Sequence, residues 1–154
     1  MNLTEEQALW AYATMMNTRD AASLEPLLAE DFHYASQWVL AEIESKDAYL
    51  DYINSKLTAI RESGSAVWAE IGWLDRELPG PCVVMAQGSR DNLIAVVFAK
   101  VKNGELRRLD LCAVPSPQLV SRTGRYPGLS TPRESSQPGL DRAIYKEVVC
   151  KAIT

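Results

Sequence analysis

The 154-residue sequence is poor in the residues that build metal sites and disulfide frameworks, with one histidine, His33, and three cysteines. Cys82, Cys112 and Cys150 are odd in number, and no two of them have Cys-x-x-Cys spacing. The sequence therefore argues against a disulfide scaffold, a structural zinc site and a histidine-rich metal site. Glycine-rich phosphate loops and dinucleotide fingerprints are missing as well, and we expect no cofactor.

Long hydrophobic runs and an excess of positive charge are also missing. No apolar run approaches the roughly 20 residues that span a bilayer, and the first residues do not resemble a signal peptide. The net charge is −4, whereas nucleic-acid-binding proteins usually present a basic face. We therefore expect a cytoplasmic protein that binds neither membranes nor nucleic acids.

The composition that remains is that of one folded domain, with 47% hydrophobic and 23% charged residues. Residues 1–114 hold 10 Lys and Arg against 17 Asp and Glu, whereas residues 115–154 hold 6 against 3. Five of the eight prolines lie between residues 115 and 139. We predict a domain over 1–114 and a proline-rich extension over 115–154. The extension is expected to be semi-extended or mobile to residue 139 and to end in a helix that begins at Asp141.

Three helices are expected in the first 114 residues. Thr4 and Gln7 have capping-box spacing at the start of a helix over 3–17. A second, short helix is predicted over about 23–30, with Pro26 in its first turn. Ser45 is the expected N-cap of a third helix, which ends near Gly64 and buries every third or fourth residue: Tyr49, Ile53, Leu57 and Ile60.

The remaining segments are predicted as strands over 32–36, 37–44, 67–73, 82–87, 92–102 and 105–114. Asn103-Gly104 forms the turn between the last two strands. Alternation from Val67 to Trp73 predicts one buried face, with Trp68 on the opposite face. In the last strand, Leu109 and Leu111 share one face, and Asp110 lies on the other. The order of elements predicts an α+β fold with helices over one curved antiparallel sheet.

Three features resemble the nuclear transport factor 2-like superfamily, which includes SnoaL-like polyketide cyclases and ketosteroid isomerases. They are the segment Asp20 to Phe32, the start of the helix at Lys46 to Ile53, and the closing Asn-Gly hairpin. The resemblance covers residues 3–114 or so. It implies a cone-shaped α+β fold, in which a curved sheet wraps the helices around an apolar pocket. It also implies a homodimer that forms through the sheet.

The resemblance assigns roles to a few residues. In the ketosteroid isomerases a helix tyrosine, a strand carboxylate and a protonated aspartic acid carry out the reaction. Tyr12 matches the tyrosine, but Ser36 stands at the place of the carboxylate, and residues 95–97 hold no acid. Isomerase-type proton abstraction is therefore not expected. Asp110 is a candidate counterpart of the aspartate that acts in the cyclases.

We therefore predict Asp110 and Tyr12 as catalytic residues. Expected ligand-binding residues are the polar side chains Tyr34 and Ser36 together with Trp38, Trp73 and Met16. Alternatives remain open for several of these residues. Tyr12 and the tryptophans suit simple core packing, and Asp110 suits an ion pair with Arg108 or Arg90. His33 is expected to face away from Tyr34 and Ser36, and Trp68 is a candidate for the dimer interface.

The first hypothesis for function is a protein that binds a small, mostly apolar molecule in an internal pocket. Cofactor-free acid–base chemistry of the isomerase, cyclase or dehydratase type would then depend on Asp110 and Tyr12. The alternative is a non-enzymatic dimeric interaction module, which uses the sheet face and the basic extension.

Overall fold

The computed structural model describes residues 2–75 and 79–129. The chain forms helix α1 (Glu5–Thr18), the 3-10 turns η1 (Ala21–Ser23) and η2 (Glu25–Leu27), strands β1 (Leu28–Ser36) and β2 (Val39–Ile43), and helix α2 (Lys46–Ser63). It continues with β3 (Val67–Leu74), β4 (Gly80–Gln87), β5 (Leu93–Lys102), β6 (Glu105–Cys112), the turn η3 (Pro117–Leu119) and β7 (Ser121–Arg125). The predicted C-terminal helix lies outside the described residues.

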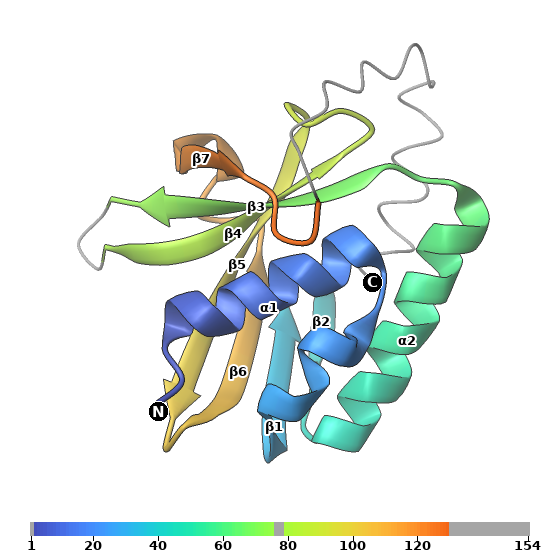
Figure 1. The fold of residues 1–154 in the computed structure, drawn as a ribbon, viewed down its shortest axis with the longest axis vertical. Helices are drawn as coiled ribbons and strands as arrows, with labels where there is room; N and C mark the ends of the chain where they lie inside the picture. Colours follow the sequence, from blue (N-terminus) through green and yellow to red (C-terminus); the bar gives the residue numbers. More distant parts are fainter. Residues whose placement is uncertain (1, 76–78, 130–154) are drawn as a thin grey trace.

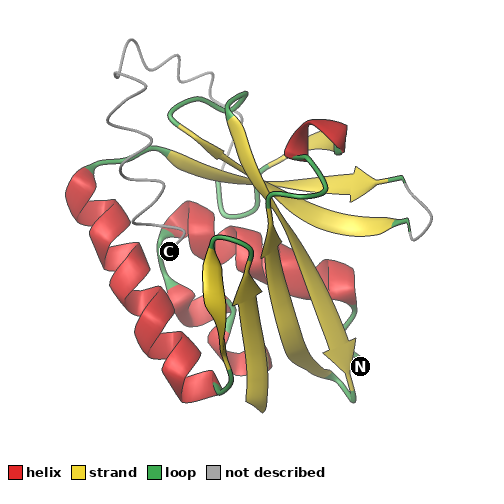
Figure 2. Ribbon diagram, turned by 180° about the vertical axis from the view of Figure 1, so that it is seen from behind, coloured by secondary structure: helices red, strands yellow, loops and turns green. Residues whose placement is uncertain are grey.

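The seven strands form one sheet in the order β2-β1-β6-β5-β4-β3-β7. The sheet is strongly curved, and the end that holds β3 and β4 runs across the end that holds β1 and β6 (Figure 2). Helices α1 and α2 lie on its concave side, with α2 beside β1 (Figure 1). The α+β fold with a curved sheet around the helices is thereby confirmed. The sheet is not wholly antiparallel, because β1 and β6 run parallel.

Both long helices begin and end as the sequence predicts. The Thr4 hydroxyl accepts a hydrogen bond from the Gln7 amide at 3.1 Å, and the Gln7 side chain accepts one from the Thr4 amide at 3.0 Å. These reciprocal bonds satisfy amide groups that have no partner within the helix. Ser45 caps α2 in a similar way, and Gly64 ends it in the left-handed conformation.

The helix expected over 23–30 does not form. Two short 3-10 turns replace it, and β1 begins already at Leu28. The first residue of the strand pairs with Leu106 of β6, and Leu28, Ala29 and Phe32 are buried. Pairing with the sheet and burial of these side chains therefore outweigh the local helical pattern.

Residues 115–129 are part of the folded body rather than a free arm. The turn η3 contacts β5, and β7 then pairs with the edge of β3. Val120 packs on the outer face against Cys82, Val84 and Val96. Gly72 lies so close beneath this segment that a Cβ atom there would collide with Val120. Because the segment covers β3, residues on both faces of that strand are buried, contrary to the single buried face expected.

Two buried polar side chains hold this segment in place. Asn17 at the end of α1 donates to the carbonyl oxygens of Ala69 and Pro127, at 2.8 and 2.7 Å, and accepts from the Ala69 amide. The Glu70 carboxylate, only 3% exposed, accepts hydrogen bonds from Arg122, the Gly124 amide and Tyr126. Since each carboxylate oxygen has a partner, the buried charge is compensated.

We predict that Glu70→Ala destabilises the protein by about 3 kcal/mol, because it takes the acceptor away from Nε of Arg122, the Gly124 amide and the Tyr126 hydroxyl. The free energy of unfolding is measured by urea denaturation. Asp91→Ala is the matched control, since Asp91 binds the same arginine at 2.8 Å but its side chain is 89% exposed. Its cost should stay below about 1 kcal/mol. Equal losses for the two variants would contradict the role given to Glu70.

Candidate functional site

The cone encloses a cavity between α2 and the concave face of the sheet. The cavity itself measures about 30 Å³, and the whole space between its walls, including the mouth open to solvent, measures about 490 Å³. Eight of the residues that line it are apolar: Met16, Ile53, Ile60, Val67, Met85, Ile94, Ala95 and Leu111. Five more of the described residues in the lining carry polar groups: Tyr12, Tyr34, Tyr52, Lys56 and Gln87.

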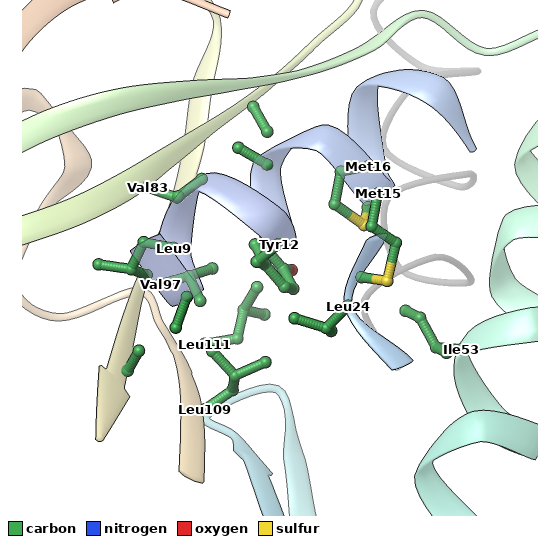
Figure 3. Packing of buried hydrophobic residues seen from close by; sticks show 14 of the residues in the cluster. Leu9, Tyr12, Met15, Met16, Leu24, Ile53, Val83, Val97, Leu109 and Leu111 are labelled. Atoms are coloured by element: carbon green, nitrogen blue, oxygen red, sulfur yellow. The ribbon is translucent and has the colours of Figure 1, made fainter. Parts of the chain in front are cut away.

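Three tyrosines from three different elements meet at this cavity. Tyr12 comes from α1, Tyr34 from β1 and Tyr52 from α2. Figure 3 shows Tyr12 surrounded by apolar side chains such as Leu9, Leu111 and Leu24. Tyr34 and Tyr52 share a hydrogen bond, and their ring centroids are 5.5 Å apart. Burial raises the pKa of all three phenols, so they remain neutral hydrogen-bond donors at physiological pH.

A fourth tyrosine lies behind this group. Tyr49 of α2 is fully buried, and its ring centroid is 4.8 Å from that of Phe32 and 5.2 Å from that of Tyr34. Its hydroxyl has no hydrogen-bond partner among the residues that the structure describes. Burial raises the pKa of this phenol too. The aromatic cluster thus contains one hydroxyl that is buried at a cost in free energy.

Gln87 borders the cavity at the end of β4 and is only 1% exposed. Its main chain is held firmly, because its amide donates to the Asn92 carbonyl at 3.1 Å and its carbonyl accepts from the Asn92 side chain at 2.8 Å. Its side-chain amide nitrogen, in contrast, has no partner within residues 2–75 and 79–129. Gln87 was not predicted as a site residue from the sequence. The sequence did hold a signal for it. Gln87 is a polar residue two positions after Met85 and four after Val83, so it lies on the same inward face of β4.

Lys56 of α2 also lines the cavity and was not singled out from the sequence. It follows Tyr52 by four residues, so the two share one helix face. Its ammonium nitrogen lies 5.4 Å from the centre of the Tyr52 ring. Partial burial lowers the pKa of this amine. The sequence could have pointed to Lys56, because this residue lies at the edge of the apolar stripe of α2 that includes Ile53 and Ile60.

The residues predicted to bind a ligand divide into two groups. Tyr12, Tyr34 and Met16 line the cavity. Ser36 is buried nearby, but it does not line the cavity, and its hydroxyl accepts from the Trp38 amide at 3.1 Å. Trp38 and Trp73 are 46% and 47% exposed and form no part of the wall.

Both tryptophan placements have a physical reason. Trp73 has the inward parity of β3, but it lies near the end of the strand, where no helix covers it. Trp38 belongs to the tight turn between β1 and β2. Trp68, the expected interface residue, is instead buried against Ala66, Ala86 and Tyr126 of the same chain.

Asp110, the predicted acid–base residue, lies on the face of β6 that points away from the cavity. In the register of the sheet Tyr34 pairs with Leu109 and Ser36 with Leu111, so Leu111 faces inward and Asp110 faces outward. Its carboxylate accepts from the Arg108 guanidinium at 3.0 Å, which is the ion pair considered as the alternative. The correction follows from strand alternation alone.

The outward face of β1, β2 and β6 carries a small network of charges around Asp110. Arg108 also binds Glu42 at 2.9 Å, and His33 lies 3.3 Å from the same carboxylate. His33 therefore faces away from Tyr34 and Ser36, as expected. His33, Glu42 and Glu44 place one potential metal ligand each within 4.8 Å of one another. Because Glu42 is already bound by Arg108, the arrangement is an ion-pair network on the surface.

The comparisons with known proteins identify the fold. No family model matches the chain, and no curated protein matches it either. A nuclear transport factor 2-like protein of unknown function from Cytophaga hutchinsonii matches with a TM-score of 0.50 and 14% identity, over 75% of this chain and 96% of that one. This chain has the nuclear transport factor 2-like fold.

A second solved structure supports the same assignment. An uncharacterized cystatin-fold protein from Novosphingobium aromaticivorans also gives a TM-score of 0.50 and 14% identity, over 72% of this chain and 99% of that one. The resemblance seen in the sequence is thus confirmed at the level of the fold. Fold alone does not determine function, which has to be argued from the site. Within the described part of the chain, no helix has both the length and the apolar character needed to cross a membrane.

We predict that Tyr49→Phe stabilises the protein by about 1 kcal/mol, since it removes a buried hydroxyl that has no partner and keeps the ring contacts. Tyr34→Phe is the matched change in the same cluster. It removes the hydrogen bond to Tyr52 and should destabilise by about 1 kcal/mol. Both free energies are measured by urea denaturation at neutral pH. A loss of stability in Tyr49→Phe would mean that its hydroxyl has a partner.

We also predict that stability falls steeply above pH 10. The phenols of Tyr12, Tyr34 and Tyr49 have raised pKa values in the folded chain and titrate near 10 when unfolded. Above pH 10 the unfolded state therefore releases protons that the folded state retains, so ionisation favours unfolding. Each such tyrosine adds up to about 1.4 kcal/mol per pH unit. Urea denaturation between pH 8 and 11 measures the slope, and Tyr49→Phe should reduce it.

Proposed function

We propose that this chain binds a small, mostly apolar molecule that carries a hydrogen-bond acceptor, in the cavity lined by Tyr12, Tyr34 and Gln87. The observation that carries this proposal is the side-chain amide of Gln87, which is buried beside the cavity without a partner. A buried donor of this kind costs about 1–3 kcal/mol, and an acceptor on a bound molecule would remove that cost. The tyrosine hydroxyls add donors on the opposite walls.

The rest of the lining supports an apolar body for the ligand. Eight of the thirteen lining residues are aliphatic or thioether side chains. Ligand sites commonly combine such a surface with a few placed polar groups, which fix the orientation of the molecule. The five polar residues of this lining provide that combination.

The size of the cavity limits the ligand. A volume of 30 Å³ is room for about two water molecules, whereas benzene fills engineered cavities of about 150 Å³. Side chains must therefore move when a ligand enters. Met16 and Met85 both line the cavity, and methionine is unbranched and adapts its shape easily. A molecule of one or two rings, or a short acyl chain, suits this space.

The position of Asp110 removes the support for acid–base chemistry at that residue. Its carboxylate lies on the outer face and is engaged by Arg108. Among the described residues, the polar groups that line the cavity are phenols, an amide and an ammonium, all of which can donate hydrogen bonds. Binding is the function that these groups support.

The alternative function, a dimeric interaction module, relied on the sheet face and on the basic extension, whose residues 130–154 lie outside the described part of the chain. Over β3 and β4 that face is covered by Val120 and Tyr126 of the same chain, and Trp68 is buried there. No observation on this part of the sheet favours the alternative over ligand binding.

The proposal predicts that 2-acetylnaphthalene binds and raises the melting temperature, while 2-ethylnaphthalene, which has the same shape but no acceptor, has a smaller effect. Gln87→Met should lower the affinity for the ketone about tenfold, because the donor is lost, while it leaves the free protein as stable or more so. Isothermal titration calorimetry measures the affinities and thermal denaturation the stability.

Asp110→Asn is the matched control for this experiment, since it lies on the outer face. It should leave the affinity for the ketone unchanged. Equal binding of the two naphthalenes, or an equal loss of affinity in Asp110→Asn and Gln87→Met, would contradict the proposal. The absence of any shift with compounds of one ring, two rings and short acyl chains would contradict ligand binding altogether.

A further inference from the structure

The side chain of Gln87 brings two hydrogen-bonding groups to the cavity, a donor and an acceptor. Both hydrogen bonds that Gln87 forms outside the strand ladder use its main chain and join it to Asn92. The side-chain nitrogen has no partner, and within residues 2–75 and 79–129 no donor bonds to the side-chain oxygen either. Because the two atoms belong to one planar amide, a flip of the group leaves the same donor and acceptor side by side.

The fold holds this amide away from water. The main chain of Gln87 pairs with Val67 of β3 and is bound on its other side by Asn92. Since side chains alternate along a strand, Gln87 points to the concave side together with Val83 and Met85. The residue is only 1% exposed. A molecule that enters the cavity is therefore the partner that this amide can meet.

An amide whose N–H and C=O lie on the same side complements both atoms of Gln87. Two antiparallel hydrogen bonds then form, in the way that glutamine reads the adjacent donor and acceptor of adenine. A ketone satisfies the side-chain nitrogen and leaves the side-chain oxygen unpaired. A site built to bind an N–H group discriminates strongly against an analogue without it, because a buried acceptor is then left without a donor.

The surroundings of Gln87 favour a neutral group over an ion. Burial raises the pKa of Tyr12 and Tyr34, because a charge in this interior is stabilised less than in water. An amide provides a donor and an acceptor without a net charge, so its burial costs little once both hydrogen bonds are made. The neutral Tyr12 phenol, which lines the cavity from α1, can donate to the second lone pair of the carbonyl oxygen.

We propose that the ligand of this cavity carries an amide whose N–H and C=O lie side by side, as in a lactam or an unsubstituted carboxamide, and that Gln87 binds both groups. This inference rests on the proposed function, because it requires that the cavity bind a small molecule through an acceptor. It adds a donor beside that acceptor and so names the class of ligand. Lactams and carboxamides share this chemistry, and the probes below distinguish them.

The test compares two-ring probes of nearly the same shape. 2-Quinolone is a lactam, coumarin has a ring oxygen in place of its N–H, and 4-quinolone carries the N–H and C=O on opposite sides of the ring. 2-Naphthamide has an amino group where 2-acetylnaphthalene has a methyl group. By isothermal titration calorimetry at pH 7, 2-quinolone should bind about tenfold more tightly than coumarin and 4-quinolone if the ligand is a lactam. If it is a carboxamide, 2-naphthamide should exceed 2-acetylnaphthalene by about the same factor.

Gln87→Met assigns the preference to the side-chain amide. Methionine has a similar length and lacks both groups, so the affinity for the preferred amide should fall about a hundredfold and that for its analogue about tenfold. The two then bind equally. Gln118→Met is the matched control, since Gln118 is exposed in η3 and does not line the cavity, and it should leave both affinities unchanged. Thermal denaturation of each free variant confirms that it is folded.

The wild-type protein gives a second readout that does not depend on how well a variant folds. The side-chain amide of Gln87 has a pair of ¹⁵N–¹H signals in a nuclear magnetic resonance spectrum. Saturation with the preferred amide should shift one of these proton signals downfield, because that proton enters a hydrogen bond. The corresponding signals of Gln118 should stay in place. Unshifted Gln87 signals at saturation would contradict the inference.

The outcomes separate this inference from the function on which it rests. If coumarin, 4-quinolone and 2-acetylnaphthalene bind as tightly as the two amides, the inference is wrong while ligand binding stands. The same holds if Gln87→Met keeps the preference and Tyr12→Phe abolishes it, since the phenol would then be the group that reads the N–H. If none of the five probes binds, and the one-ring and short acyl compounds also fail, the proposed function is wrong and the inference fails with it.

Discussion

The pairing of β1 with β6 decides which side chains face the interior of the cone. The two strands run parallel, with Tyr34 opposite Leu109 and Ser36 opposite Leu111. Because paired residues share a face and side chains alternate along a strand, a slip of β6 by one residue against β1 would bring Asp110 inside beside Tyr34 and turn Leu109 and Leu111 outward. The observed register instead places the phenol in the cavity and the aspartate in an ion pair with Arg108. The chemical character of the site follows from this one alignment.

The interior that results is rich in hydroxyl groups for a hydrophobic core. Four tyrosines converge there, and at least one buried hydroxyl and one buried amide, on Tyr49 and Gln87, have no partner in the described structure. Phenylalanine and leucine would fill the same space without the cost of burying unpaired donors. A core built only for stability does not require these groups. Their concentration beside one cavity is the reason why we propose a binding role for that cavity.

Much of the fold was predictable because its signals are local. The capping box at Thr4, the cap at Ser45, the stop at Gly64 and the stripe from Tyr49 to Ile60 each depend on residues within one turn of a helix. The outward direction of His33 followed from strand parity. The same parity already separated Asp110 from Leu109 and Leu111, so its assignment as a pocket residue gave more weight to the family resemblance than to the alternation.

The errors arose where a distant segment determines burial. Trp68 was expected at an interface and Trp73 in the pocket, because the parity of β3 was known but its cover was not. The cover of the outer face is residues 120–126, about fifty residues further along the chain. Gln87 and Lys56 were missed for a related reason. Gln87 follows the apolar run of β4, and Lys56 lies beside the apolar stripe of α2. Only the packing of α2 against the curved sheet brings both residues to one cavity.

The two faces of the sheet are therefore used differently. The inner face lines the cavity, and the outer face at β3 and β4 is covered by residues 120–126. Glu70 and Asn17 fix residues 122–127 against β3, one from the outer face and the other from the end of α1. With its outer face covered there, the β3–β4 end of the sheet forms the back wall of the cavity, to which Val67, Met85 and Gln87 contribute. The wall opposite is α2, which packs mainly against β1. Because α2 packs mainly against β1, it contributes to the cavity through one face, which carries Tyr52, Ile53, Lys56 and Ile60. Tyr52 and Lys56 belong to α2 and Gln87 to β4, so polar side chains reach the cavity from both walls although each wall is mainly apolar.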